Sequence, residues 1–318
     1  MKISFTICSA NYLPYAKVFA DSLIRHNSDP LFIIVLLDKY LDIDFTFFQP
    51  HIVLHAEEMG IPAFEEMNER YSIFELSCAL KPYAAEYLFR SRPQCDILFY
   101  FDADISVYNA LNAAEAALTH HPILFTPHIA TPKEFDNRLA IEKNLLRTGV
   151  YNAGFFGLNR SEETNAFLIW WMKRMEDQCY NNTAEGLFVD QLWINLAPVL
   201  FRHVMIFYDE GYNLAYWNLG ERKLVYSGGA YTINEKYPLV FFHYSGFDLN
   251  TEILSKHFPV YTFETTPQAA ALFTAYKEAV LKNNRDNFLS LVPQMGKKDP
   301  PPPEPEEIIV IPEREKFF

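Results

Sequence analysis

Residues 96–104 read DILFYFDAD, an apolar run followed at once by two aspartates. The run 96–101 predicts a buried strand, and Asp102 and Asp104 stand two residues apart on the turn that leaves it. Two carboxylates placed in this way can face one hard divalent cation, and such a cation can neutralise a diphosphate leaving group. The alternative is a helix-capping or solvated pair in a turn. A second Asp-x-Asp, at 42–44, lies several residues into a polar loop, so the context favours 102–104 as the metal site.

Strand and helix patterns alternate along the chain around this stretch. Residues 2–8 and 31–37 are apolar runs typical of buried strands, and between them apolar residues recur at helical spacing after Asn11 and Pro14. This alternation predicts an α/β protein with a doubly wound, mostly parallel central sheet flanked by helices, which binds ligands at the carboxyl ends of its strands. We expect further strands at 51–54, 122–126, 150–158, 204–208 and 239–244, and helices at 72–90, 162–178, 187–197 and 266–290.

The C-terminal end of the chain differs from the rest in composition. We expect residues 1–290 to form one domain and residues 291–318 to form a tail. The tail holds a proline run and mixed charges, which are typical of an extended or disordered segment. The apolar segment 308–311 (IIVI) within it could dock on a partner or back on the domain.

Composition restricts the class of protein. Half of the 318 residues are hydrophobic and 16% are aromatic, which excludes wholesale disorder. The formal net charge of -13 argues against nucleic acid as a partner but is compatible with a small phosphorylated ligand. The four cysteines form no CxxC pair and no cluster at zinc spacing, so we expect reduced, buried thiols. Without a signal-peptide core or a run of about 20 apolar residues, the sequence predicts a cytoplasmic protein with no transmembrane segment. Peripheral membrane contact and the oligomeric state stay open.

Three other motifs carry polar groups that could take part in chemistry. His243 ends an apolar strand and is followed by a turn at Gly246, so it is either a metal ligand or a satisfied core histidine. Asn152, in the run 151–157, can present its amide to a sugar hydroxyl beside glycines that permit close backbone approach, although a β-bulge gives the same pattern. Asp190 can bind sugar hydroxyls or cap the helix that follows it.

Taken in order, these motifs resemble those of a GT-A glycosyltransferase, closest to the pattern of glycosyltransferase family 8. The resemblance spans about residues 3–248 and is more specific for the fold and the metal site than for the family. It does not indicate the sugar. The residues that carry it are Ser9, Ala10, Asn11, Tyr12, Lys81, Phe101, Asp102, Ala103, Asp104, Asn152, Ala153, Gly154, Asp190, Gln191, His243 and Gly246.

The resemblance implies a role for each of these positions. Asp102, Asp104 and His243 match the three protein ligands of Mn²⁺, or of Mg²⁺ in its place. Asn11 and Tyr12 match the positions that hold the nucleotide base, the tyrosine by stacking. The other implied assignments are donor contacts at Ala10, Lys81, Asp102, Ala103, Asn152, Ala153, Gly154 and Gly246, and catalytic positions at Asp190, which also matches a donor-sugar contact, and Gln191, near the reacting carbon.

The implied activity is metal-dependent transfer of a sugar from a nucleotide-sugar donor, with a UDP-sugar as the first candidate. The acceptor would be a saccharide or glycoconjugate, as in cell-surface polysaccharide synthesis. A retaining enzyme would use front-side attack guided by the leaving phosphate, because Gln191 is a poor nucleophile. An inverting enzyme would need a general base, for which Asp190 is the candidate.

One position departs from the family pattern His-x-x-Gly-x-x-Lys, whose lysine touches the diphosphate. Leu249 stands in that place, so either Lys256 or Lys81 takes the role or the family is a divergent one. Two rival functions also stay open. A sugar-phosphate nucleotidyltransferase shares the sheet and the metal chemistry, but it usually has a glycine-rich loop after the first strand, and 9–17 (SANYLPYAK) contains no glycine. A non-catalytic nucleotide-sugar-binding relative is the other rival, and the intact ligand set argues against it.

Overall fold

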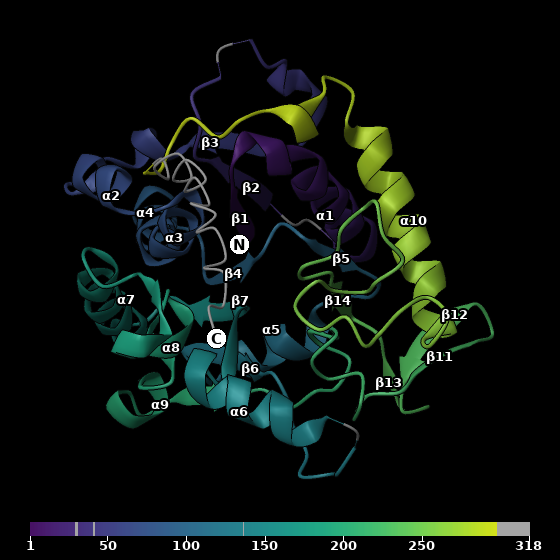
Figure 1. Ribbon diagram of the computed structural model, residues 1–318. Helices are drawn as coiled ribbons and strands as arrows, with labels where there is room; N and C mark the ends of the chain where they lie inside the picture. The colour runs from purple at the N-terminus through teal and green to yellow at the C-terminus, as the bar shows by residue number, and fades with distance from the viewer. Residues whose placement is uncertain (29–30, 41, 136, 298–318) are drawn as a thin grey trace, which may run out of the picture.

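A seven-stranded sheet forms the centre of the protein in a computed structural model that describes residues 1–297 except 29–30, 41 and 136 (Figure 1). β1 to β4 are mutually parallel, β6 and β10 are parallel, and β7 runs antiparallel between β4 and β6. The sheet is therefore mostly parallel, as the sequence predicted. Its order is β10-β6-β7-β4-β1-β2-β3, formed by Val204–Ile206, Ile123–Pro127, Tyr151–Asn159, Ile97–Phe101, Lys2–Cys8, Leu31–Leu36 and Ile52–His55.

Helices cover both faces of this sheet. In β2, Ile33 and Val35 join a core with α3, α4 and α7, whereas Phe32 and Ile34 join a second core with α1 and α5. The continuous apolar run in β2 is thus explained by burial on both faces. The helices are α1 Leu13–His26, α2 Phe64–Arg70, α3 Ile73–Ala79, α4 Lys81–Ser91, α5 Asn112–Leu118, α6 Arg138–Thr148, α7 Glu162–Met175, α8 Gln191–Ile194, α9 Ala197–Leu200 and α10 Pro267–Asn283.

A third apolar cluster joins the C-terminal part of the chain to the domain. α10 lies beside α1, and Phe273 of α10 packs against Phe242 and Tyr244 at the end of β14 (Figure 1). β14 pairs antiparallel with β5, directly after the Asp-x-Asp turn. The strands outside the central sheet are β5 Ile105–Val107, β8 Asn181–Asn182, β9 Leu187–Phe188, β11 Leu224–Ser227, β12 Ala230–Ile233, β13 Tyr237–Pro238 and β14 Phe241–His243.

Local sequence explains where the helices differ from expectation. The single helix predicted at 72–90 is two helices, α3 and α4, which meet at Leu80. Pro82 has no N–H to donate to the preceding turn, so it begins a new helix and places Lys81 at its first position. The helix expected at 187–197 is the short α8, followed by the separate α9, and the one expected at 266–290 ends at Asn283.

The segment after α10 stays on the domain as far as the structure describes it. Met295 is 8% exposed and belongs to the core that contains α3 and α4. The rest of the expected tail, 298–318, lies outside the described residues, and the domain boundary at 290 stays a prediction. Cys8, Cys78, Cys95 and Cys179 are free and buried, as expected. Among the helices of the described residues, none combines the length and the apolar content needed to cross a bilayer.

Candidate active site

Two strand ends bring the predicted metal ligands together. Asp102 directly follows β4, Asp104 lies in the turn to β5, and the pairing of β14 with β5 sets His243 opposite Ile105. His243 Nε2 lies 3.1 Å from Asp104 Oδ1 and 3.8 Å from Asp102 Oδ2. One ligand atom from each of the three residues lies within 4.8 Å of the others. The three side chains that the sequence suggested as ligands therefore face one point.

The carboxylates set the electrostatics of this point. His243 is 3% exposed, and burial alone would lower its pKa, but Asp104 and then Asp102 raise the pKa above its ordinary value. Burial acts to raise the pKa of Asp104, and His243 lowers it below its ordinary value. The site thus favours positive charge between its acidic groups, which is what a cation site requires.

Asn213 orients the imidazole of His243. Its amide nitrogen donates to Thr126 Oγ1 at 2.9 Å and to Asn152 Oδ1 at 3.0 Å, so its oxygen faces His243 Nδ1 at 3.3 Å. Because that oxygen accepts, Nδ1 carries a hydrogen, and Nε2, which faces the carboxylates, is the nitrogen that can bind a cation. Asn213 has a φ of 57°, a conformation that asparagine adopts more readily than most residues. The sequence did not predict a role for Asn213, because a single asparagine in a loop does not by itself indicate a function.

Gly154 on β7 leaves room for two of the ligands. A Cβ at this position would lie 2.5 Å from His243 Cε1 and 2.6 Å from Asp102 Oδ2. Its carbonyl also accepts a hydrogen bond of 2.8 Å from the Asp102 N–H. The close backbone approach expected at this glycine is therefore an approach to His243 and Asp102, two of the predicted metal ligands.

Lys81 lies buried behind the acidic pair. Its Nζ lies 3.0 Å from Asp190 Oδ2 and 3.5 Å from Asp102 Oδ1, and it donates to the Ala153 carbonyl at 3.1 Å. Burial would lower the pKa of Lys81, but Asp102 and Asp190 raise it, so the lysine stays charged. Tyr100 donates to the same Asp102 oxygen at 2.6 Å. One oxygen of Asp102 is thus held by Tyr100 and Lys81, and the other faces His243.

Asp190 and Gln191 face inward. Asp190 is 1% exposed, its side chain does not cap α8, and burial raises its pKa against the opposing effect of Lys81. Gln191 Oε1 lies 3.2 Å from the Ala153 N–H and 3.3 Å from Asn152 Nδ2, and its Nε2 donates to the Thr148 carbonyl at 2.8 Å. Both residues lie next to the acidic site: the amide of Gln191 is hydrogen-bonded to the protein, and Asp190 forms an ion pair with Lys81. Their catalytic roles, and the sugar contact of Asn152, stay predictions.

The predicted nucleotide loop follows β1 as the short 3₁₀ turn η1, Ala10–Tyr12. Ser9 Oγ donates to Asn11 Oδ1 at 2.6 Å, which orients that amide. Tyr12 is 44% exposed, and its ring centroid lies 5.0 Å from that of Tyr15. Partial burial and then the charges of Asp104 and Asp102 raise the pKa of Tyr12 to about 12.

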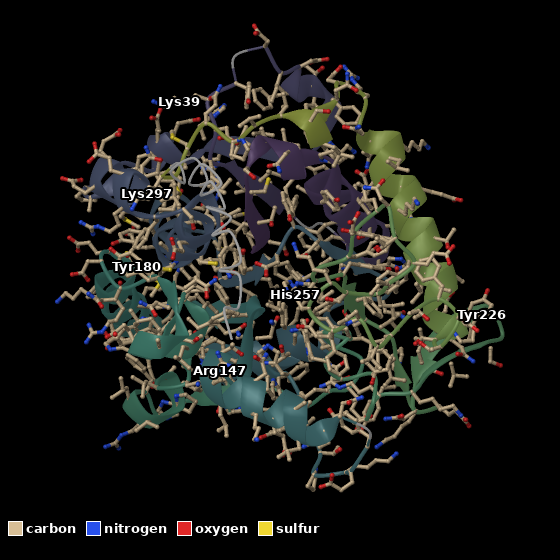
Figure 2. The ribbon with its side chains drawn as sticks, viewed as in Figure 1. Lys39, Arg147, Tyr180, Tyr226, His257 and Lys297 are labelled. Carbon is tan, nitrogen blue, oxygen red and sulfur yellow. The ribbon has the colours of Figure 1, made fainter. Side chains whose placement is uncertain are left out.

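The structure shows what surrounds Leu249, which stands where the family pattern has a lysine. Leu249 is 8% exposed and belongs to the third apolar cluster, whereas Gly246 has a φ of 71° and lies against His257. The Lys256 N–H donates to the Gly246 carbonyl at 2.9 Å. Figure 2 shows His257 near the middle of the face that is turned to the viewer. The segment with Lys256 and His257 therefore lies over the turn where the family pattern is interrupted.

Comparison with solved structures decides the fold. The galactosyltransferase LgtC, solved in complex with donor and acceptor sugar analogs, superimposes with a TM-score of 0.51 over 92% of this chain and 98% of that chain, at 15% identity. The chain has a GT-A glycosyltransferase fold. A second GT-A match is the apo structure of the bifunctional glycosyltransferase WbbM, with a TM-score of 0.52 over 90% of this chain and half of that chain, at 13% identity.

Sequence relatives add little about activity. No protein-family model matches the chain. Two proteins of Bacillus subtilis strain 168, YfnF and YfnD, both described as uncharacterized, are each 26% identical to it. The similarity covers 57% of this chain and 60% of YfnF, and 79% of this chain and 76% of YfnD.

Proposed function

We propose that this protein is a metal-dependent glycosyltransferase that moves a sugar from a nucleoside-diphosphate sugar to a saccharide or glycoconjugate acceptor. The observation that carries the proposal is the convergence of Asp102, Asp104 and His243 at the carboxyl end of β4, on a GT-A fold. UDP-sugars are the first donors to test, because the sequence resembles family 8.

The chemistry of the site fits a divalent metal. Two carboxylates and one imidazole suit Mn²⁺ better than Mg²⁺, because Mg²⁺ accepts nitrogen ligands less readily. The hydrogen bond from His243 to Asn213 leaves Nε2 as the free ligand atom, and the missing side chain of Gly154 leaves space beside it. When bound, the metal would supply positive charge to the departing diphosphate.

The residues of the chain would prepare the donor for transfer. Tyr12 and Asn11 would hold the base, and Lys81 would keep Asp102 in place while balancing the charge of Asp190. In the transfer, the bond between the sugar carbon and the phosphate oxygen breaks and a new bond to the acceptor oxygen forms. The acceptor proton would go to the leaving phosphate in a front-side reaction, or to a base in an inverting one. The burial of Asp190 and its pairing with Lys81 favour the front-side route.

A thermal-shift screen of nucleotide sugars with and without Mn²⁺ tests the proposal. A donor at 100 times its Kd stabilises the native state by about 2.7 kcal/mol. We expect one class of nucleotide sugar to raise the Tm, only with Mn²⁺ present, and the same compound to be hydrolysed or transferred on incubation. A nucleotidyltransferase would instead release diphosphate from a nucleoside triphosphate and a sugar phosphate. Binding without hydrolysis or transfer would indicate the non-catalytic relative.

A further inference from the structure

Asp38 is a buried carboxylate that joins two distant parts of the chain. It follows β2 and is 0% exposed. Its Oδ2 accepts a hydrogen bond of 2.6 Å from the N–H of Ala10, and its Oδ1 accepts bonds of 2.6 and 3.2 Å from the N–H groups of Gln294 and Met295. Within the described part of the chain, no lysine, arginine or histidine forms an ion pair with it. Three backbone donors therefore carry the stabilisation of this charge.

The segment that supplies two of these donors is anchored along its length. We call residues 292–297 the C-terminal strap. The Val292 carbonyl accepts from Tyr40, Gln294 Oε1 accepts from the Lys39 N–H, the Gly296 N–H donates to Asn68, and the Lys297 N–H donates to the Tyr71 carbonyl, at distances of 2.6, 3.0, 2.7 and 2.6 Å.

The path of the strap is also fixed by packing. Met295 is buried, and Gly296 has a φ of 83° with no space for a side chain, because a Cβ there would lie 2.6 Å from the Ile73 nitrogen. The yellow end of the chain runs from α10 to the region of α2 and α3, and Lys39 and Lys297 are labelled on that side (Figures 1 and 2). The strap is thus a fitted part of the domain.

We propose that Asp38 is a positioning residue for the nucleotide donor, and that it works by tying the loop 9–12 to the C-terminal strap. The proposal rests on the proposed function. Ala10 precedes Asn11 and Tyr12, whose side chains are the candidates for holding the base. A bond from Asp38 to the Ala10 amide fixes where η1 begins, and the strap fixes the carboxylate from the other side.

The expected effect on nucleotide affinity follows from the fraction of molecules in which the loop 9–12 is preformed. If the loop is preformed in only a fraction of molecules, the apparent Kd for the nucleotide is the intrinsic Kd divided by that fraction. Loss of the Asp38 bonds removes charge-assisted hydrogen bonds that hold the loop, so we expect the apparent Kd to rise roughly tenfold. Because Asp38 contacts only backbone groups of the loop, the Mn²⁺ requirement should be unchanged.

The test combines amide hydrogen exchange at Ala10 with binding of UDP, GDP, ADP and CDP in the presence of Mn²⁺. The variants are Asp38→Asn and Asp38→Ala, with Asp42→Asn as the control, because Asp42 is an exposed carboxylate in the same connection. We expect the Asp38 variants to exchange the Ala10 amide faster by roughly tenfold and to bind the best nucleotide more weakly, and the control to match the wild type in both measurements.

A pair of truncations tests the role of the strap without changing Asp38. Ending the chain after residue 297 keeps the strap, and ending it after residue 291 removes it. We expect only the shorter protein to show faster exchange at Ala10 and a higher nucleotide Kd. If Asp38→Ala does not fold, Asp38→Asn and this pair give the answer.

Equal exchange at Ala10 in the Asp38 variants and Asp42→Asn, or in the two truncations, would overturn the inference. Faster exchange with an unchanged Kd would overturn the link to the donor. If the wild type binds none of the four diphosphates, the proposed function fails, and hydrogen exchange still decides whether Asp38 and the strap hold the loop.

Discussion

The chain contains two Asp-x-Asp sequences, and the structure gives them different surroundings. Asp42 and Asp44 are exposed. Asp44 Oδ1 accepts from the Thr46 N–H at 3.0 Å, at the start of a 3₁₀ turn, and its Oδ2 pairs with Arg285 at 3.0 Å. The hydrogen bonds from Thr46 and the charge of Arg285 lower the pKa of Asp44. The contacts of Asp44 therefore stabilise its own turn and an ion pair at the surface.

The pair at 102–104 takes its chemistry from what surrounds it. Tyr100 and Lys81 hold one oxygen of Asp102, and His243 faces both carboxylates. The difference between the pairs is the strand before each and the residues that the fold brings beside it. Three side chains directed at one point are a stronger indication of a cation site than the motif alone.

Removal of either carboxylate of the pair at 102–104 should have the largest effect on the rate. We expect Asp102→Ala or Asp104→Ala to lower the rate of transfer about a thousandfold or more, because the metal supplies several kcal/mol of charge stabilisation. The Tm should stay close to that of the wild type. Steady-state rates and thermal unfolding of the same preparations check this, and wild-type turnover in either variant would remove the distinction between the two pairs.

Loss of Lys81, which is buried next to Asp102 and Asp190, should have the largest effect on stability. Lys81→Met leaves Asp190 buried without its cation, which we expect to cost about 3–5 kcal/mol in the free energy of unfolding. Burial already raises the folded pKa of Asp190, and loss of Lys81 would raise it further, so protonation of Asp190 should shrink the deficit as the pH falls toward 4.

Denaturant titrations at several pH values measure this deficit. Lys2→Met is the matched control, because the part-exposed pair of Lys2 and Glu115 should contribute about 0–1 kcal/mol. A deficit in Lys81→Met as small as in Lys2→Met, or one that grows as the pH falls, would show that Asp190 does not depend on Lys81.

A methyl group between the ligands should have an intermediate effect. Gly154→Ala would place Cβ against His243 and Asp102, and we expect a loss of about 1–3 kcal/mol together with weaker Mn²⁺ affinity. Gly157→Ala in the same strand is the control, because the nearest contacts of its Cβ would be with Leu118 and Phe99. It should lower the Tm and leave the Mn²⁺ dependence of the rate unchanged. If the two variants require the same Mn²⁺ concentration, the space at Gly154 does not serve the metal.

Changes to the pair at 42–44 should give the smallest effect. The double variant Asp42→Asn with Asp44→Asn should keep full activity and lose at most about 1 kcal/mol of stability, because asparagine also caps a turn. Activity assays across Mn²⁺ concentrations measure this. A changed metal requirement in this variant would mean that Asp42 and Asp44, and not the pair at 102–104, bind the metal.

The sequence predicted the central fold because its signals were local. The apolar runs at 2–8 and 31–37, and the turn after 96–101, each indicate a strand without knowledge of its partner. The convergence of His243 with the acidic pair depends on β14 pairing with β5, which are far apart in the sequence, so the residues alone favoured a core histidine. The resemblance resolved that choice, and the geometry agrees with it.

Other features of the site had no usable sequence signal. The orienting role of Asn213 needs three partners from separate elements, and Asp38 looks like an ordinary polar residue at a strand end. The resemblance placed Gln191 and Asp190 in roles by position, but the hydrogen bonds of Gln191 to β7 and the ion pair of Asp190 with Lys81 of α4 depend on packing. Long-range contacts of this kind cannot be read from spacing.

The most direct test of the metal centre is a titration of Mn²⁺ against wild type and His243→Ala, with the rate and the Tm measured on the same samples. A ligand histidine predicts that the wild type prefers Mn²⁺ to Mg²⁺, that the variant loses most of this preference, and that excess Mn²⁺ restores part of its activity. A core histidine predicts a lower Tm, an unchanged Mn²⁺ requirement and no recovery with added metal. That second result would contradict the assignment of Asp102, Asp104 and His243 as one metal site.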